Sequence, residues 1–155
     1  MQRLHVNLAV EDLDRSIAFY RTLFGAEPTV RHADYAKWML DDPRVNFALA
    51  QRGRAPGVDH LGIQVDSAEE LAAVTHRLAE AGQAVVEQHQ TECCYARSDK
   101  TWATDPTGVP WETFHTTGDL TTYGKDSDTV APASACCGDT PCGTEATAEA
   151  ERCCV

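Results

Sequence analysis

Apolar and polar residues alternate over the first ten positions of the chain, the pattern of a β-strand with one buried face. The apolar face carries Val6, Leu8 and Val10, and the other face carries His5, Asn7 and Ala9. Successive side chains of a strand point to opposite sides of the sheet. The histidine is therefore expected to point away from the apolar core, into a space lined by polar or small groups.

The same pattern recurs near the middle of the chain. His60-Leu-Gly-Ile-Gln-Val65 resembles His5-Val-Asn-Leu-Ala-Val10 at an offset of 55 residues. Such a repeat indicates two copies of one structural unit. His5 and His60 then hold equivalent places and face the same kind of cavity.

Each of these strands precedes a segment with the spacing of an amphipathic helix. The apolar stripes are Leu13, Ile17, Tyr20 and Phe24 in the first copy, and Leu71, Val74 and Leu78 in the second. Asp12 is the expected N-cap of the first helix, which stops at Gly25. The second helix begins at the capping box Ser67-Ala-Glu-Glu70 and ends at Gly82. Both helices are expected to cover the sheet with one face.

Three short strand candidates follow each helix. They are residues 28–33, 35–41 and 45–51 in the first copy, and 84–89, 95–104 and 110–115 in the second. Asp42-Pro43 matches Asp105-Pro106 at an offset of 63, so the second copy has gained eight residues before its last strand. The insertion contains Thr91-Glu-Cys-Cys-Tyr95, where we expect specificity to lie. The predicted fold is α+β, with two tandem βαβββ modules, about 1–52 and 58–115, in one cupped mixed sheet.

Length and charge narrow the classes of function. A chain of 155 residues suits one domain. A formal net charge of −11 without a Lys/Arg stripe argues against a nucleic-acid partner. No apolar run approaches the roughly 18 residues of a membrane span, and the first residues resemble a strand instead of a signal peptide. We expect a cytoplasmic protein with small-molecule partners and no membrane association.

The composition changes after the last predicted strand. Residues 116–155 have few large apolar side chains and an excess of acidic ones, which predicts a flexible tail behind a domain at 1–115. Two of the seven cysteines, Cys93 and Cys94, lie in the domain, and the tail holds Cys136, Cys137, Cys142, Cys153 and Cys154. An odd count with adjacent pairs does not suit a secreted disulfide framework. Thiols that meet a soft metal or metalloid fit better, although we assign the tail no catalytic role.

His5, His60 and Glu112 are candidate metal ligands. Two neutral imidazoles and one carboxylate leave coordination positions open, as in non-haem iron(II) enzymes that bind oxygen. An isolated His or Glu is more often structural, but the repeat favours ligands here. Ala48 stands where the first copy would place a fourth ligand. Strand alternation turns His115 to the opposite face from Glu112, which makes it a weak ligand candidate. Three histidines have no repeat partner and are expected to be solvated or structural: His32, His76 and His89.

These features resemble the vicinal oxygen chelate superfamily over residues 1–115. Within it, the sequence is similar to the organoarsenical carbon–arsenic bond lyases and to the cadmium-induced proteins. The narrower resemblance rests on the opening strand, the Trp111-Glu112 pair, the Cys-rich tail and two motifs. These motifs are Thr91-Glu-Cys-Cys-Tyr-Ala96 and Trp102-Ala-Thr-Asp-Pro-Thr-Gly108.

The resemblance implies an iron(II)-dependent, O2-using lyase that converts trivalent organoarsenicals such as methylarsenite into arsenite. Its metal ligands carry over to His5, His60 and Glu112, which also accept manganese, nickel, cobalt or zinc. Its arsenic-binding pair carries over to Cys93 and Cys94, because two thiolates can replace the two hydroxyls of a monoorganyl arsenic(III). For that, the pair must lie in a turn, since neighbouring side chains of a strand diverge. Pocket candidates are Tyr95, Lys100 and Trp102.

Other interpretations stay open at this point. Cys93 and Cys94 could be inert, or joined as a strained disulfide. A glyoxalase-like enzyme or a thiol transferase for antibiotic resistance uses similar ligands, although Ala48 argues against a four-ligand glyoxalase. A non-catalytic protein that sequesters cadmium or arsenic also fits the seven thiols. Methyl and aryl substrates, and a monomer or a homodimer, agree equally with the pattern.

Overall fold

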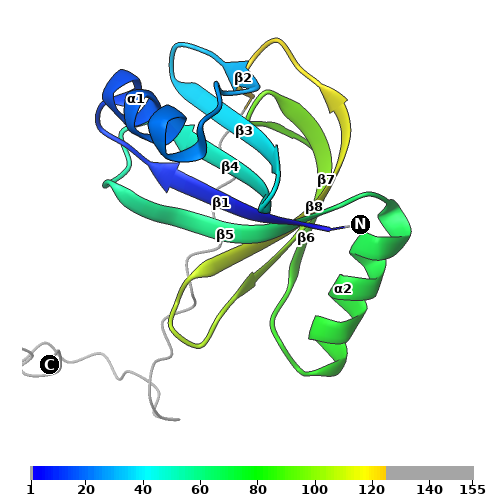
Figure 1. Cartoon of the computed structure of the whole chain (residues 1–155). Helices are drawn as coiled ribbons and strands as arrows, with labels where there is room; N and C mark the ends of the chain where they lie inside the picture. The colour runs from blue at the N-terminus through cyan, green and yellow to red at the C-terminus, as the bar shows by residue number, and fades with distance from the viewer. Residues whose placement is uncertain (1, 125–155) are drawn as a thin grey trace, which may run out of the picture.

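A computed structural model describes residues 2–124 of the chain. In this part, one mixed sheet of eight strands curls around an open side, and two helices cover its outer surface (Figure 1). The first module consists of β1 (Arg3–Ala9), α1 (Leu13–Phe24), β2 (Val30–Arg31), β3 (Tyr35–Asp41) and β4 (Arg44–Ala50). The second consists of β5 (Gly57–Val65), α2 (Ala68–Glu80), β6 (Val86–Cys93), β7 (Ala96–Thr104) and β8 (Pro110–Asp119). The predicted fold class is confirmed.

The two modules meet in the middle of the sheet. The strand order is β2-β3-β4-β1-β5-β8-β7-β6, and β1 pairs with β5 in antiparallel orientation. In each module the opening strand also pairs in parallel with the last one, β1 with β4 and β5 with β8. Asn7 lies opposite His60 and His5 lies opposite Gly62. The joint between the modules therefore brings the two histidines together.

Both helices begin at the predicted residues, and α1 ends at the predicted Gly25, whereas α2 ends at Glu80 with its cap at Ala81, one residue before the predicted Gly82. Asp12 accepts a hydrogen bond from the Arg15 amide, and Gly25 closes α1 with a φ of 65°. The Ser67 hydroxyl accepts from the Glu70 amide at the start of α2. At the end of α2, Gly82 has a φ of 73°, a conformation that glycine adopts without a Cβ clash. Neither helix of residues 2–124 is long and apolar enough to cross a membrane.

The core under α1 is rich in aromatic residues. Its buried members are Leu13, Ile17, Ala36, Trp38, Val45, Phe47 and Leu49, and Val6, Leu8, Val10, Tyr20 and Phe24 pack against them. This is the apolar face predicted for the first strand and helix. The opposite face of β1 carries His5, Asn7 and Ala9, which are also buried. The sheet thus has a packed outer side and an inner side that holds polar groups.

The domain continues past the predicted boundary at residue 115. Strand β8 runs to Asp119, because Thr116, Gly118 and Asp119 pair with the lengthened β7. The prediction that the tail begins at residue 116 was therefore wrong. Small and polar residues complete this ladder with their backbones, and a composition signal does not detect such pairing. The rest of the predicted tail, residues 125–155 with its five cysteines, lies outside the described residues.

The insertion predicted in the second module lies in a hairpin. Strands β6 and β7 have eight and nine residues, whereas their counterparts β2 and β3 have two and seven. Both β2 and β6 differ from the predicted ranges 28–33 and 84–89. The tip of the longer hairpin carries Cys93 and Cys94.

Candidate functional site

Three buried side chains from three strands converge on the inner face of the sheet. His5 comes from β1, His60 from β5 and Glu112 from β8. The two Nε2 atoms lie 3.2 Å apart. Oε2 of Glu112 lies 3.7 Å from Nε2 of His5 and 3.5 Å from Nε2 of His60. The structure therefore brings the three predicted ligands together.

A glycine allows this approach between β5 and β8. Gly62 pairs with Glu112, and a Cβ at position 62 would overlap the Glu112 carbonyl oxygen. The equivalent pair in the first module is Asn7 with Ala48. The register thus confirms that Ala48 corresponds to Glu112.

Hydrogen bonds on the far side of each ring orient the two imidazoles. Nδ1 of His5 lies 3.0 Å from the Asn46 carbonyl oxygen, and Nδ1 of His60 lies 2.8 Å from a carboxylate oxygen of Asp59. Both Nδ1 atoms thus face acceptors, so each Nε2 can point a lone pair inward. Arg54 in turn donates to Asp59 at 2.6 Å.

Sequence reasoning missed Asp59, because a neighbour of His60 on a regular strand would face the opposite side. The pairing of β1 with β5 shifts register here: Asn7 pairs with His60 and Leu8 with Val58. Asp59 is the additional residue of this bulge, which re-aims side chains. Alternation alone does not signal such a bulge.

The electrostatics of the three ligands differ. Burial lowers the pKa of His5 to about 4. Burial acts in the same direction on His60, but hydrogen bonds with Asp59 and Glu112 raise its pKa to about 9. Burial would raise the pKa of Glu112, yet Lys100 and the two imidazoles hold it well below its usual range. The carboxylate is therefore ionised at neutral pH.

The donor set fits a divalent metal. Ligand atoms each roughly 2.1 Å from one ion lie no more than about 4.2 Å apart, and all three separations here satisfy that limit. Oδ1 of Asn7 is buried beside them without a hydrogen-bond partner in residues 2–124. This oxygen could accept a hydrogen bond from a molecule bound to the ion. Within the described chain, His5, His60 and Glu112 are the group that could hold such an ion.

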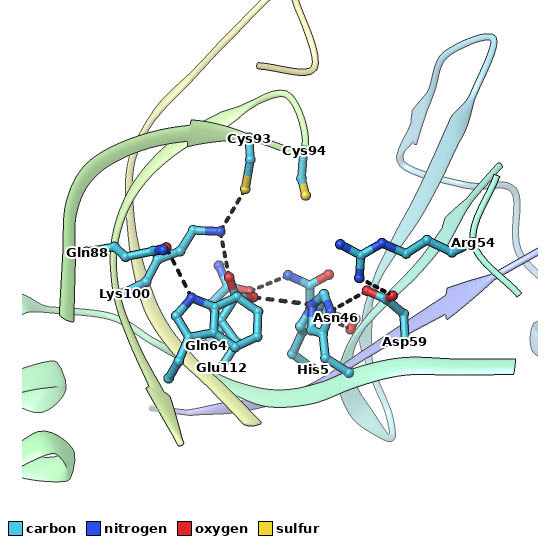
Figure 2. A network of polar contacts seen from close by, with 12 residues as sticks. His5, Asn46, Arg54, Asp59, Gln64, Gln88, Cys93, Cys94, Lys100 and Glu112 are labelled. Carbon is cyan, nitrogen blue, oxygen red and sulfur yellow. Dashed lines mark hydrogen bonds and ion pairs between the residues drawn. The ribbon is translucent and has the colours of Figure 1, made fainter. Parts of the chain in front are cut away.

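Cys93 and Cys94 lie above these ligands at the turn from β6 to β7. Cys94 and Tyr95 have φ angles of 57° and 61°, so the chain bends as predicted for a chelating pair. In Figure 2 both sulfur atoms are on the side of the turn that faces Lys100 and Glu112. Neither cysteine is in a disulfide bond, so the disulfide interpretation does not hold.

Lys100 links the thiols to the metal ligands. Its ammonium group, buried on β7, donates to Sγ of Cys93 at 2.7 Å and to Oε1 of Glu112 at 2.5 Å (Figure 2). Glu112 thus uses one oxygen for Lys100 and presents the other to the histidines. Burial would lower the pKa of Lys100, but Glu112 and Cys93 raise it above its usual value.

The two thiols are electrostatically distinct. A hydrogen bond with Cys94 and the nearby Lys100 ammonium lower the pKa of Cys93 to about 6, although burial acts in the opposite direction. The pKa of Cys94 is well above its usual value, because its hydrogen bond with Cys93 and its burial both favour the thiol. The pair therefore consists of one thiolate and one thiol at neutral pH.

Two cavities meet at this site. The larger, of about 220 Å³, is lined by His5, Lys37 and Phe114 among others, and the smaller, of about 30 Å³, by His60 and Trp102 among others. Residues shared by both cavities are Asn7, Cys93, Cys94, Lys100 and Glu112. The predicted pocket residues Lys100 and Trp102 are thus in the lining.

Tyr95 is not in the lining of either cavity. Its ring stacks on His32 and its hydroxyl donates to Asp34, because the left-handed turn directs its side chain toward the first module. The remaining histidines match their predicted surroundings: His76 and His89 are exposed, and His115 is on the other face of β8 from Glu112.

The Trp102–Gly108 motif forms the turn that leads into β8. The Asp105 carboxylate accepts hydrogen bonds from Thr107, from the Val109 amide and from the Trp111 indole. These bonds lower the pKa of Asp105 to about 2, and the bond from the Thr107 hydroxyl has the largest effect. The motif therefore serves to position the strand that carries Glu112.

Comparisons with known proteins agree with this fold. The chain is 42% identical over 159 residues to the trivalent organoarsenical cleaving enzyme of Bacillus sp. (strain MD1), covering 99% of this chain and 91% of that one. It is 37% identical over 156 residues to the trivalent organoarsenical cleaving enzyme of Thermomonospora curvata, covering 99% and 100%.

Among solved structures, the Mn(II)-bound glyoxalase from Novosphingobium aromaticivorans superposes with a TM-score of 0.56 at 20% identity, over 82% of this chain and 43% of that one. This likeness concerns the fold. The model of the Glyoxalase/Bleomycin resistance protein/Dioxygenase superfamily matches residues 2–113. The chain therefore belongs to the glyoxalase/bleomycin resistance protein/dioxygenase superfamily.

Proposed function

We propose that this protein is an iron(II)-dependent, oxygen-using lyase that cleaves the carbon–arsenic bond of trivalent organoarsenicals and releases arsenite. The observation that carries the proposal is that a three-ligand metal site and a vicinal thiol pair border the same cavities. The names of the two relatives, both trivalent organoarsenical cleaving enzymes, support the same substrate class.

The thiol pair matches the valence of the substrate. A monoorganyl arsenic(III) carries two hydroxyls, and Cys93 and Cys94 can replace both because trivalent arsenic prefers soft sulfur ligands. Two As–S bonds form while two As–O bonds break. The hydroxyls leave as water, taking the proton of Cys94 and one from solvent. Arsenic remains trivalent, and the carbon substituent keeps its bond to arsenic.

His5, His60 and Glu112 would hold the metal, and bound iron(II) would supply the binding and activation of oxygen. The chain contributes orientation. The hydrogen bond with Cys94 and the Lys100 ammonium together keep Cys93 deprotonated. Lys100 also holds one oxygen of Glu112, so the carboxylate offers its other oxygen to the metal. Cys93 and Cys94 then fix the bond to be cleaved on the side of the turn that faces the metal ligands.

The overall reaction balances with oxygen as the oxidant. For methylarsenite, CH3As(OH)2 and O2 give As(OH)3 and formaldehyde. The carbon loses four electrons, the two oxygen atoms accept them, and arsenic stays trivalent. No further reductant is needed.

The test is a single-turnover experiment under controlled oxygen. Purified protein is loaded with iron(II) without oxygen, given one equivalent of methylarsenite and then exposed to O2, and arsenite is separated from methylarsenite by chromatography. We expect arsenite only after O2 is added, and none from the Cys94→Ser or Glu112→Ala chain. Failure of the loaded wild-type protein to release arsenite would defeat the proposal.

The same experiment separates the alternatives. Turnover that depends on an added thiol and proceeds without O2 would indicate a thiol transferase or a glyoxalase-like enzyme. Stoichiometric capture of arsenic with no product would indicate a sequestering protein.

A further inference from the structure

The turn that carries the thiols has a conformation that residues with side chains seldom adopt. Cys94 and Tyr95 are consecutive and both have positive φ, in the region where a Cβ crowds the neighbouring carbonyl. Neighbouring side chains of an extended strand would point to opposite faces, so chelation by both sulfur atoms depends on this bend. Contacts around the turn must favour it.

A short segment after β8, residues 120–124, packs on the turn. The Leu120 amide donates to the Tyr95 carbonyl oxygen at 2.8 Å, and Gly124 forms a β-bridge with Cys93. Gly124 has a φ of 81°, and a Cβ there would overlap the Glu92 backbone. This segment, the clasp, therefore lies directly against the end of β6.

Tyr123 is the side chain through which the clasp contacts the site. Its ring meets Tyr95 and Tyr35 edge to face, at centroid distances of 5.5 and 6.0 Å. The Arg52 guanidinium lies 3.8 Å above the ring centroid, within the range of a cation–π contact. The hydroxyl oxygen is 3.5 Å from Sγ of Cys94. Tyr123 thus contacts both residues of the thiol turn that have positive φ, Cys94 and Tyr95.

The first module holds the other side of the turn. Tyr95 stacks on His32 with centroids 3.5 Å apart, and its hydroxyl donates to Asp34 at 2.8 Å. Arg52 donates to the same carboxylate at 2.5 Å. Arg52 therefore connects both supports, because it contacts Asp34 on one side and Tyr123 on the other.

We propose that the clasp, through the ring of Tyr123, is a positioning element that holds Cys93 and Cys94 in the shape in which one arsenic atom can bind both. The proposal rests on the proposed function in that these two thiols capture the arsenic. When only a fraction of the molecules has the competent shape, the apparent affinity falls by that fraction. This loss of affinity affects the second As–S bond, because that bond closes the chelate and needs both sulfur atoms in place.

The test compares arsenic(III) compounds of different valence. Phenylarsine oxide has two exchangeable positions and needs both thiols, whereas a dimethylarsenic(III) compound has one and needs a single thiol. Full-length protein is used with its other cysteines replaced by serine, so that binding reports this pair. The replaced residues are Cys136, Cys137, Cys142, Cys153 and Cys154. Dissociation constants come from anaerobic titration calorimetry.

Tyr123→Ala should bind phenylarsine oxide about tenfold more weakly (about 1.4 kcal/mol), with unchanged affinity for the dimethyl compound and for iron(II). Tyr123→Phe keeps the ring and should restore affinity to within about twofold. Thr121→Ala, an exposed neighbour on the clasp, is the matched control and should bind like the wild type.

Two results would overturn the role of the clasp. One is wild-type affinity of Tyr123→Ala for phenylarsine oxide, and the other is an equal loss for both arsenic compounds, which would indicate damage to a single thiol. The proposed function fails separately. Cys93→Ser and Cys94→Ser chains that bind phenylarsine oxide as tightly as the wild type would show that the pair is not the arsenic site.

Discussion

The two modules share one topology but differ in what they bury. Under α1, Tyr20, Phe24, Trp38 and Phe47 form a connected set of aromatic contacts. Under α2, the buried residues include Leu71, Val74 and Thr101, and a hydroxyl pair at 2.6 Å, Thr75 with Thr101, takes the place of ring packing. The first module therefore contributes the denser core. The second contributes Glu112, Lys100 and both thiols of the described residues.

One pair of equivalent positions illustrates this difference between the two modules. Glu112 is a candidate ligand in the second module, whereas Ala48 in the first is fully buried beside Tyr35 and Ala50. Cys94 and Tyr123 pack against this small cluster. A carboxylate at position 48 would occupy the space used by the thiol turn. The lack of a fourth ligand at position 48 and the space for the thiol turn thus both follow from the small side chain of Ala48.

The largest expected contrast concerns stability. Trp38→Ala removes a fully buried indole and its hydrogen bond to the Ala26 carbonyl, and should cost about 3–5 kcal/mol. Thr101→Ala removes one hydroxyl bond and a methyl group and should cost about 1–2 kcal/mol. Urea unfolding followed by circular dichroism measures both. Equal losses would contradict the view that the first module holds the denser core.

The next contrast is between the equivalent positions 48 and 112. Glu112→Ala makes the second module resemble the first and leaves two imidazoles as ligands. Iron(II) affinity should fall at least about a hundredfold (about 2.7 kcal/mol), as measured by anaerobic competition with a chromogenic chelator. Glu87→Ala, which removes an exposed carboxylate of β6 outside the ligand group, serves as the control. Affinity of Glu112→Ala within about fivefold of the wild type would exclude Glu112 as a ligand.

The third contrast is between the groups that contact the Nδ1 atoms of the two histidines. His5 has a neutral backbone carbonyl as its partner and His60 has the Asp59 carboxylate. Substitution of such outer partners typically costs 10–100-fold in metal affinity, so Asp59→Asn should weaken iron(II) binding about tenfold. Arg54→Gln removes a donor to Asp59 and leaves the Asp59 carboxylate in place, so it should lower iron(II) affinity by less than about threefold. If Asp59→Asn bound the metal like the wild type, the carboxylate would not support His60.

Much of this arrangement follows from local signals that the sequence displays directly. Alternation placed His5 on the inner face, the caps at Asp12 and Gly25 set the limits of α1, and the repeat identified His60 as the second histidine. Each of these inferences needs only neighbours in the chain or a repeat of the same pattern. The thiol turn was instead implied by the family resemblance, because two adjacent cysteines that bind one arsenic atom must leave the regular strand.

The features that were not predicted depend on contacts between distant segments. Asp59 supports His60 only because a bulge interrupts the pairing with β1. The clasp depends on Tyr123 packing against Arg52, 71 positions earlier in the chain. In the sequence, residues 116–124 differ little from the segment that follows. Backbone pairing and a single aromatic contact hold them in the domain, and neither produces a periodic pattern.

The smallest expected contrast compares two lysines that line the larger cavity, Lys100 from the second module and Lys37 from the first. Lys100 donates to Cys93 and helps to lower the pKa of that thiol to about 6. In Lys100→Met the charge is lost, so the pKa of Cys93 should rise by about one unit, a change of about 1.4 kcal/mol.

The thiolate is the form that reacts with iodoacetamide, so the rate of Cys93 modification reports this pKa. In the wild type the rate should rise through a midpoint near pH 6. In Lys100→Met the midpoint should move up by about one unit, which makes the variant slower between pH 6 and 7 and equal to the wild type well above both midpoints. Tandem mass spectrometry distinguishes Cys93 from Cys94. Lys37→Met should leave the profile unchanged, because Lys37 interacts with Asp119 and Cys94 and is not among the groups that shift the pKa of Cys93. An unshifted profile in Lys100→Met would mean that the hydrogen bond with Cys94 alone keeps Cys93 ionised, and that Lys100 serves Glu112 only.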